Sequence, residues 1–521
     1  MRRRVGREVA AALSVAVVVG ALAASAQARN AYVVNKSPSG VSVIDTDTNQ
    51  LIGSPIAVGA GPSRVAITPD GSRAYVTNGG SGTVSVINTR TNATVGSPIP
   101  VGSGPFDIAI TPDGSRAYVV RQVNPGIVRV INTRTDSVVG PPITVGSNPV
   151  GIAITPNGSR AYVTNNGGST VSVINTQTNA VVGSPIAVGS SPRGIAITPN
   201  GLRAYVANNV GNNVSVINTQ TNTTVGSPIP VGGGGLWVAV TPNGSRAYAS
   251  FSAGAGPEVA VINTQTNTTV GSPIEAGTSV RGIAITPDGS RAYAAGEGAV
   301  RAISTRTNTA VGAPITISGD PFSVAITPDQ TPRASFSAPG EGLSATLDGG
   351  GSTDDERIAS YEWDFGDGTS ARTTTPVIEH AYTTVGEFTA KLTVSDGEGC
   401  PGFVYTGQTA SCNGPSENAI TRTVATVKLG KLKRKKQKGT AVQKVEVPGP
   451  GELELSGKGA KRRTEPVEGG GVEKLKIKPK GKRKRKLKRK GKAKVTVEIA
   501  FTPDGGDPNT QAKKVKLVKR R

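Results

Sequence analysis

The sequence predicts an all-β protein whose largest part is a ring of repeated four-stranded units. Three observations support this fold class. The 521 residues include 68 Gly and 36 Pro, and Val, Ile and Thr dominate between them, as in short strands joined by tight turns. One unit of about 43 residues recurs along the first three fifths of the chain. Its apolar runs are short and β-branched, which is typical of strands.

A tyrosine marks the repeat. Its copies lie 43 to 45 residues apart, at Tyr32, Tyr75, Tyr118, Tyr162, Tyr205, Tyr248 and Tyr293. The copy at residues 64–105 contains four β-branched runs, VAIT, RAYVTN, TVSVINT and TVGSPIPV, which are separated by PDGS, a Gly-rich link and TRTN. Such linkers form tight turns between antiparallel strands. Four strands per unit predict the blade of a β-propeller.

The two ends of the array predict a closed ring. The first unit begins at Tyr32 without its ITP strand, and the last ITP strand, residues 322–328, has no unit after it. Together these fragments complete one blade, which gives seven and leaves no exposed edge. The alternative is an open β-solenoid, which would have half a unit at each end.

The units resemble the YVTN β-propeller repeat family. The residues that carry the resemblance are AYVTN at 74–78 and 161–165, the preceding ITPDG or ITPNG, and the following VSVINT. The resemblance implies a seven-bladed propeller over residues 29–331. Such propellers occur in surface-layer-like and adhesive proteins and beside redox and lactonase-like enzymes, so the resemblance leaves the function open.

One face of the ring is expected to bind a partner. Connections in a four-stranded meander alternate between the faces, so the TPDGSR and INTRTN turns share one face. The blade links and the loops between second and third strands share the other, and only this face varies between copies, which suggests a binding surface. Drift of exposed loops is the alternative. The residues predicted at the channel mouth are Arg64, Phe106, Asp107, Arg193, Trp237, Arg281 and Phe322, with Arg121, Gln122, Phe251 and Glu297 further out.

The propeller lacks the residues of several catalytic chemistries. Residues 29–331 contain no His and no Cys, which excludes a His-ligated copper site, haem ligation and a Ser-His-Asp triad there. The repeated Asp70, Asp113 and Asp288 are interpreted as turn residues, because Asn takes their place in other copies. We therefore expect that the chain is not an enzyme.

Residues 332–427 resemble a PKD domain, which implies an immunoglobulin-like β-sandwich. The matching residues are WDFGDG at 363–368, His380, Tyr382, Gly386 and 394–396. An insertion around Cys400 and Cys412 departs from the pattern, and these two cysteines are predicted to form one local disulfide. The single histidine, His380, is expected to pack and not to catalyse.

No cofactor is predicted, with calcium as the one candidate. Asp354, Asp355, Asp364 and Asp367 could supply oxygen ligands to Ca²⁺, as some PKD-like domains do. The favoured interpretation is that Asp364 and Asp367 brace the FGDG turn.

Residues 1–28 are predicted to be a signal peptide. Four arginines precede an apolar run at 9–22, and Ala26-Gln27-Ala28 is an A-x-A cleavage site. A retained membrane anchor is the alternative, although the run is short for a full span.

Residues 428–521 carry the entire net charge of +23, with 32 Lys and Arg against 9 Asp and Glu. Alternating stretches such as AKVTVEIAF predict a small basic β-domain of five or six strands. The alternative is a disordered polycation in which residues 482–490 form a crowded hairpin loop. The predicted polyanion-binding residues are Lys433, Arg434, Lys435, Lys436, Lys482, Arg483, Lys484, Arg485, Lys486, Lys488, Arg489 and Lys490.

The predicted function is a secreted, envelope-associated binding or display protein. Its basic domain would attach to anionic envelope polymers or surface glycans, and its propeller face would contact proteins or glycans. Nucleic acid is less favoured, because Phe501 is the only aromatic residue of the basic segment. Two alternatives stay open: a secreted lactonase-like or lyase-like propeller enzyme, and an extracellular nucleic-acid or polyanion binder.

Overall fold

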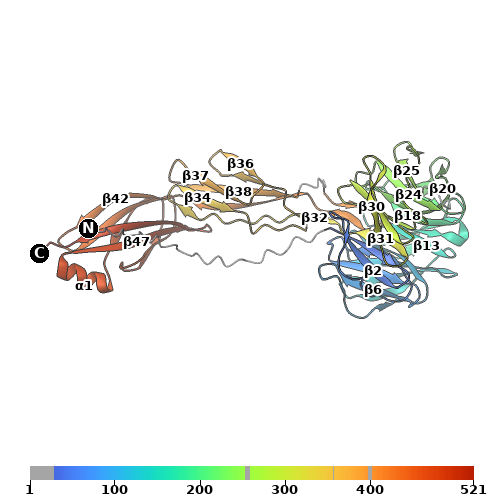
Figure 1. The fold of residues 1–521 in the computed structure, drawn as a ribbon, viewed down its shortest axis with the longest axis horizontal. Helices are drawn as coiled ribbons and strands as arrows, with labels where there is room; N and C mark the ends of the chain where they lie inside the picture. The colour runs from blue at the N-terminus through green and yellow to red at the C-terminus, as the bar shows by residue number, and fades with distance from the viewer. Residues whose placement is uncertain (1–28, 253–257, 356, 397–401, 521) are drawn as a thin grey trace, which may run out of the picture.

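The computed structural model describes residues 29–520 apart from 253–257, 356 and 397–401. The predicted signal peptide and Cys400 lie outside the described residues. The chain forms a propeller, a β-sandwich and a basic β-domain, one after another along the long axis of the molecule (Figure 1). The predicted all-β fold class is confirmed.

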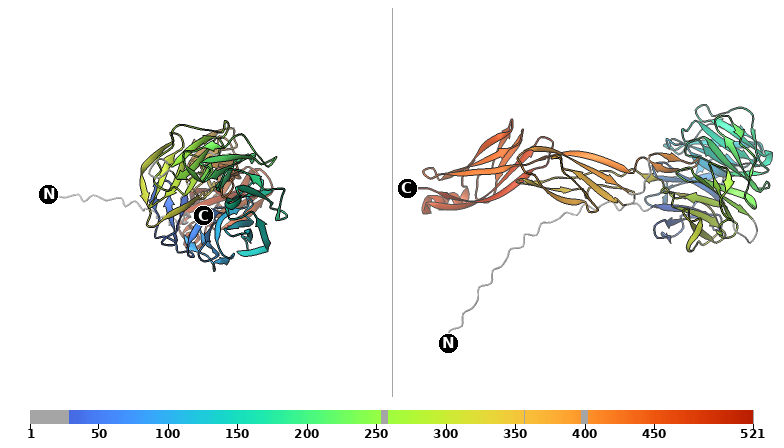
Figure 2. Two further views of the ribbon diagram at one scale, coloured as in Figure 1. Left: turned by 90° about the vertical axis from the view of Figure 1, so that its right-hand side faces the viewer. Right: turned by 90° about the horizontal axis from the view of Figure 1, so that it is seen from above.

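Seven sheets make the propeller, which confirms the predicted number of blades. Seen along the long axis of the molecule, they form a ring (Figure 2). The first strand of each blade lies innermost, and successive first strands contact one another around the axis. The inner strands are β31 (Pro321–Ile326), β4 (Pro62–Ile67), β9 (Pro105–Ile110), β13 (Pro149–Ile154), β18 (Pro192–Ile197), β23 (Gly234–Val240) and β27 (Gly282–Ile285).

The remaining strands of each blade follow outward in antiparallel order. The second strands are β1 (Asn30–Asn35), β5 (Arg73–Asn78), β10 (Arg116–Arg121), β14 (Arg160–Asn165), β19 (Arg203–Asn208), β24 (Arg246–Ser252) and β28 (Arg291–Gly296). The third strands are β2 (Gly40–Asp45), β6 (Thr83–Asn88), β11 (Gly126–Asn132), β15 (Thr170–Asn175), β20 (Asn213–Asn218), β25 (Val259–Asn263) and β29 (Ala299–Ser304). The outer strands are short, as in β3 (Gln50–Leu51), or long, as in β12 (Ser137–Val145) and β30 (Thr309–Thr316).

The ring closes as the sequence predicts. β31, the last inner strand, pairs with β1, and Tyr32 lies opposite Ala325. The end of the array therefore completes the blade that the start of the array leaves unfinished.

The repeated tyrosine fastens each blade to the next. The Tyr75 hydroxyl donates to Thr133 O at 3.1 Å and to Asp136 Oδ1 at 2.7 Å. The other six tyrosines bond to the equivalent Thr carbonyl and Asn side chain of the following blade, and Tyr293 reaches back to Thr46 and Asn49. The acceptor Asn or Asp has a positive φ in every copy, a conformation that Asn and Asp tolerate. The turn must therefore supply an acceptor for the tyrosine hydroxyl and a residue that tolerates a positive φ. These two requirements explain why the INTRTN turn hardly varies.

The second part of the chain is a sandwich of two sheets. One sheet has the order β36 (Ser370–Thr373), β35 (Ser360–Asp364), β38 (Glu387–Ser395) and β41 (Glu417–Ala425). The facing strands are β33 (Gly340–Glu341), β34 (Ser344–Asp348) and β37 (Val377–Ala381). Trp363 and Leu392 are buried between the sheets.

The basic segment is folded, but it differs from the prediction. It has seven strands and not five or six: β42 (Lys428–Lys435), β43 (Thr440–Val447), β44 (Gly451–Ser456), β45 (Arg463–Val467), β46 (Gly471–Ile477), β47 (Lys492–Pro503) and β48 (Asn509–Val518). The residues that a disordered polycation would hold in a hairpin loop form a helix, α1 (Gly481–Lys490). β48 pairs with β33, so one seven-stranded sheet joins this segment to the sandwich.

No helix among the described residues is long and apolar enough to cross a membrane.

Candidate functional site: the two ends of the propeller channel

The seven inner strands run parallel around the axis, so their first residues lie at one end of the channel and their last residues at the other. The first end carries the variable blade links, and we call it the mouth. At the other end, residues 404–413 form a β-hairpin of β39 (Val404–Tyr405) and β40 (Ala410–Asn413). This hairpin, which we call the loop 404–413, contacts the last residues of four inner strands. The mouth therefore faces away from the rest of the chain.

Six of the eight residues predicted for propeller binding line one pocket of about 290 Å³ at the mouth: Arg64, Phe106, Arg193, Trp237, Arg281 and Phe322. The pocket is also lined by five residues that were not predicted from the sequence: Val150, Asn209, Leu236, Ser252 and Ser279. Val150 and Leu236 occupy the same link position as Phe106 and Arg193, so a comparison of the links could have found them.

Arg64 forms the floor of this pocket. Its guanidinium carbon lies 3.5 Å from the ring centroid of Trp237 and 4.9 Å from that of Phe322. Its Nη1 donates to the carbonyl oxygens of Arg281 and Phe322, at 2.9 Å each. Burial, together with the nearby charges of Arg193 and Arg281, lowers the pKa of Arg64 to about 9, although Asp107 opposes the shift. Arg64 is therefore still cationic at neutral pH.

Arg193 and Arg281 differ in how their charge is balanced. Arg281 Nη1 lies 2.7 Å from Asp320 Oδ2, and its Nη2 lies 3.5 Å from Glu297 Oε1. Neither Arg64 nor Arg193 forms an ion pair with a described residue. The Nε atoms of both are buried without a hydrogen-bond partner among the described atoms. The pocket thus has excess positive charge between aromatic walls.

Two predicted residues lie elsewhere. Asp107 was expected at the mouth, but it is 1% exposed and accepts a hydrogen bond from Ile152 N at 2.8 Å. A second hydrogen bond, from Gln408 Nε2 at 2.8 Å, also holds the Asp107 carboxylate inside the channel. Arg121 lies further out, as predicted, and its Nε donates to Ser103 O at 2.9 Å.

The loop 404–413 closes the other end of the channel. Ile197 N, Ile154 N and Ile110 N donate to the carbonyl oxygens of Thr406, Gly407 and Gln408 at 3.1, 2.7 and 3.3 Å. The Tyr405 hydroxyl donates to Ile110 O. The loop therefore satisfies backbone groups at the ends of the inner strands.

Gln408 is the residue of this loop whose side chain bonds to Asp107. Its Nε2 donates to Asp107 Oδ2 at 2.8 Å and to Ile152 O at 3.2 Å. Burial raises the pKa of Asp107 to about 7, against the opposing effects of Arg64 and of the hydrogen bonds from Ile152, Ile108 and Gln408.

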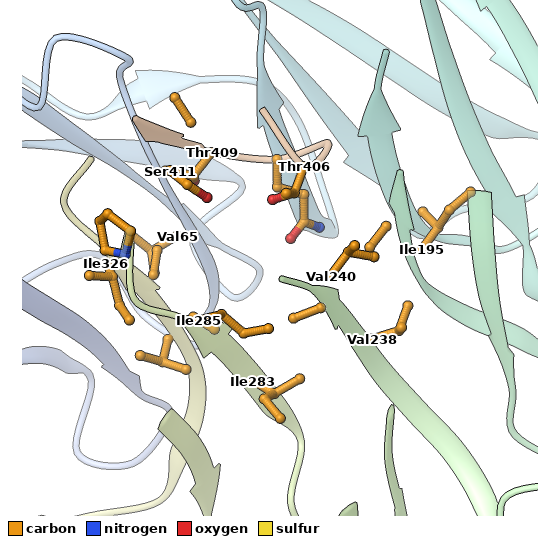
Figure 3. Close-up of a pocket in the computed structure, with 18 residues that line it drawn as sticks. Val65, Ile195, Val238, Val240, Ile283, Ile285, Ile326, Thr406, Thr409 and Ser411 are labelled. Atoms are coloured by element: carbon orange, nitrogen blue, oxygen red, sulfur yellow. The ribbon is translucent and has the colours of Figure 1, made fainter. Parts of the chain in front are cut away.

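A cavity of about 70 Å³ lies between the loop and the channel wall. Thr406, Thr409 and Ser411 face Val65, Val240, Ile285 and other apolar side chains of the inner strands across it (Figure 3). Such a volume can hold a few water molecules. The sequence indicated a loop here, but nothing in it showed where the loop would lie.

The predicted calcium candidates have local partners. Asp364 Oδ1 accepts from Gly366 N at 2.9 Å, and Asp367 Oδ2 lies 2.8 Å from Nε2 of His380, whose ring stacks on Phe365 at 3.9 Å. No group of three or more candidate ligands occurs among the described residues. Calcium binding and the disulfide between Cys400 and the buried Cys412 stay predictions.

Comparison with known proteins agrees with this architecture. Residues 97–237 match the family model "Lactonase, 7-bladed beta-propeller", and residues 329–408 match the PKD domain model. The chain is thus a seven-bladed propeller followed by a PKD domain.

Two solved structures show the same propeller fold. A functionally unknown protein from Desulfotomaculum acetoxidans has 20% identity and a TM-score of 0.50 over 57% of this chain and 98% of its own. A "putative 6-phosphogluconolactonase" from Bacteroides uniformis has 15% identity and a TM-score of 0.50 over 58% of this chain and 100% of its own.

The lactonase match corrects one expectation. The sequence led us to expect that the chain is not an enzyme, and the match to an enzyme family model contradicts this. The missing His and Cys exclude particular catalytic sites in the ring and do not exclude hydrolysis as such.

Proposed function

We propose that the propeller is a lactonase-type hydrolase whose substrates are small anionic lactones bound at the mouth. The observation that carries the proposal is the pocket floored by Arg64 and lined by Arg193, two arginines that form no ion pair with a described residue. A phosphate or carboxylate group on the substrate would balance this positive charge. The rings of Phe106, Trp237 and Phe322 would contact its apolar faces.

The mouth offers groups for each part of a lactone hydrolysis. A water oxygen adds to the carbonyl carbon, and the carbonyl electron pair moves to oxygen. The ring C–O bond then breaks, the ring oxygen takes up a proton, and a hydroxy acid results. An arginine would stabilise the transient oxyanion. Glu297, half-exposed beside Arg281, is the candidate acceptor for the proton of the attacking water.

The test compares an anionic with a neutral substrate. Proton release by the chain beginning at Arg29 is measured with 6-phosphogluconolactone and with unphosphorylated δ-gluconolactone. We expect a higher kcat/KM for the phosphorylated compound, and at least a tenfold loss for that compound alone in Arg193→Gln. Arg90→Gln, in an exposed turn after β6, is the matched control. Equal rates on both substrates, or an unaffected Arg193→Gln, would overturn the proposal.

We further propose that the chain is exported and acts outside the cytoplasm. The support is the arginine-led apolar segment before Ala28. N-terminal sequencing of the protein recovered from the producing cells tests this, and a start at Arg29 is expected. A start at Met1 in protein from the cytoplasmic fraction would contradict it.

A further inference from the structure

Three basic stretches that are far apart in the sequence meet at the free end of the basic domain. They are residues 433–438, residues 482–490 and residues 516–520, and we call this surface the basic tip. Arg520 N donates to Lys436 O at 3.1 Å, and Lys519 N donates to Gly491 O at 2.8 Å. Arg434 Nε donates to Lys516 O at 3.1 Å. The tip lies at the opposite end of the molecule from the propeller (Figure 1).

The charge of the basic tip is not balanced within the chain. Its three stretches contain no Asp and no Glu, and none of their described residues takes part in an ion pair. All basic residues of α1 except the half-buried Arg483 are exposed. Lys494 and Lys516 lie directly opposite each other in β47 and β48, a like-charge arrangement that destabilises a sheet. Bound anions would relieve this repulsion.

One side chain holds α1 in place. Leu487 is buried in the domain core, and its Cδ2 lies so close to Gly439 that a Cβ on that glycine would be 2.8 Å away. Since Leu487 is the only apolar residue of the helix, α1 presents no apolar face to a bilayer. All its exposed sides are cationic, which suits a flexible linear polymer better than a small ion in a pocket.

We propose that the basic tip binds a linear anionic glycopolymer, with phosphodiester or carboxylate groups along its chain. Charge complementarity supports this partner. Single-stranded nucleic acid fits less well, because its bases would need exposed aromatic rings to stack on. Phe501, the only aromatic residue of residues 428–521, is fully buried.

The test uses the full chain from Arg29 and a charge-matched control. The tip variant replaces Lys484, Arg485, Lys486 and Lys488 by Gln. The control variant replaces Lys391, Lys428, Lys444 and Lys474, which are exposed residues outside the tip, by Gln. The probes are a poly(glycerol phosphate) teichoic acid, polygalacturonate and a single-stranded DNA, each measured from 50 to 300 mM NaCl.

We expect the tip variant to bind both glycopolymers at least tenfold more weakly and with a shallower salt dependence, while the control changes by less than twofold. Equal losses in both variants would show a net-charge effect and overturn the site. Tighter binding of DNA than of either glycopolymer at 150 mM NaCl would overturn the partner. Lactone hydrolysis by the tip variant should be unchanged. A failure of the proposed glycopolymer binding can therefore be distinguished from a failure of the proposed hydrolysis at the mouth.

Discussion

Asp107 shows how one residue connects the two ends of the channel. It begins in the blade link that forms the mouth, but its carboxylate turns inward and meets Gln408 from the sandwich loop. Burial keeps the pKa of this carboxyl near 7, far above the usual value of about 3.9 for Asp. A proton on Asp107 is therefore linked to folding.

The sign of this linkage can be tested with Asp107→Asn. Between about pH 4 and pH 7 the folded protein holds a proton on Asp107 that the unfolded chain has lost, so the free energy of unfolding falls as pH rises through this window. Asn keeps an acceptor oxygen and cannot titrate, so the variant should lose part of this decline, on the order of 1–3 kcal/mol. Chemical denaturation at pH 5 and pH 8 measures it.

The control for this experiment is Asp113→Asn. Asp113 sits in a turn, its pKa is lowered by hydrogen bonds from Thr111 and Ser115 although burial opposes this, and other copies of the repeat carry Asn there. This variant should keep the decline between pH 5 and pH 8. Burial and the charge of Asp354 also raise the pKa of Asp355, so some decline in the free energy of unfolding should remain in every variant. If the free energy of unfolding of Asp107→Asn depends on pH as it does in the unchanged protein, Asp107 is not the group responsible for the decline.

At the scale of the element, the third residue of each blade link affects how the mouth is filled. The third link residue points toward the channel axis, where Arg64 and Trp237 fill the space. In three other blades this position is Gly, as at Gly194, where a Cβ would lie 2.7 Å from Trp237 Cα and 2.9 Å from its ring. The glycine thus allows the neighbouring inner strand and the tryptophan to approach.

Gly194→Ala should therefore disturb the mouth. The added methyl group meets backbone as well as ring atoms, so we expect a loss of about 1–3 kcal/mol in the free energy of unfolding, together with a change in Trp fluorescence. Gly168→Ala is the control, because its nearest atom, Thr170 Oγ1, would be at 3.5 Å. If the free energy of unfolding and the Trp fluorescence change in both variants, or in neither, the close approach of Gly194 to Trp237 is not the cause of the change.

The basic side chains of the helix α1 destabilise the helix that carries them. Lys and Arg in its first turn face the positive end of the helix dipole, and pairs such as Lys482 and Lys486 repel each other by about 0.2–0.5 kcal/mol. Backbone amides of residues 482–490 should therefore exchange hydrogen more slowly at 500 mM than at 50 mM NaCl, as read by mass spectrometry.

Lys484→Glu provides the comparison for the salt experiment. It places an acid in the first turn, four residues before Lys488, which is the favourable order for an ion pair in a helix. Exchange in this variant should be slower at 50 mM NaCl and should depend less on salt. If the exchange rate of α1 with its original sequence is the same at both salt concentrations, charge repulsion does not limit the stability of α1.

The blades were predictable because each is determined by local chemistry: turn residues, β-branched runs and a tyrosine that recurs with the period of the repeat. The six mouth residues followed from two observations: connections alternate between the two faces of the ring, and the blade links vary between copies. The loop 404–413 was not predictable, because polar residues such as Gln408 carry no periodic signal for a partner 300 positions earlier. α1 was missed because a single Leu487 among basic residues gives no apolar stripe.

At the scale of the whole molecule, the sandwich and the basic domain depend on each other. Asn509 Nδ2, at the start of β48, donates to Gly342 O at 2.9 Å and to Ala425 O at 3.1 Å. Asp507 lies 3.0 Å from Arg422 and accepts from Ala338 N at 2.6 Å. Together with the shared sheet, these contacts indicate one cooperative unit, whereas the propeller closes on itself.

A chain truncated after Val427 should consequently lose stability in the sandwich as well as the basic tip. Without β48, β33 loses its neighbour, and the backbone groups that Asn509 satisfies are left open. We expect the calorimetric transition of the sandwich to move to lower temperature by several degrees, since about 1 kcal/mol lowers the Tm of a domain of this size by roughly 4–8 °C. The propeller transition should move less, because its ring of tyrosine bonds is intact.

The full-length tip variant is the control and should keep both transitions. If truncation leaves the sandwich transition unchanged, the shared sheet does not couple the two parts, and truncation after Val427 becomes a clean test of the basic tip.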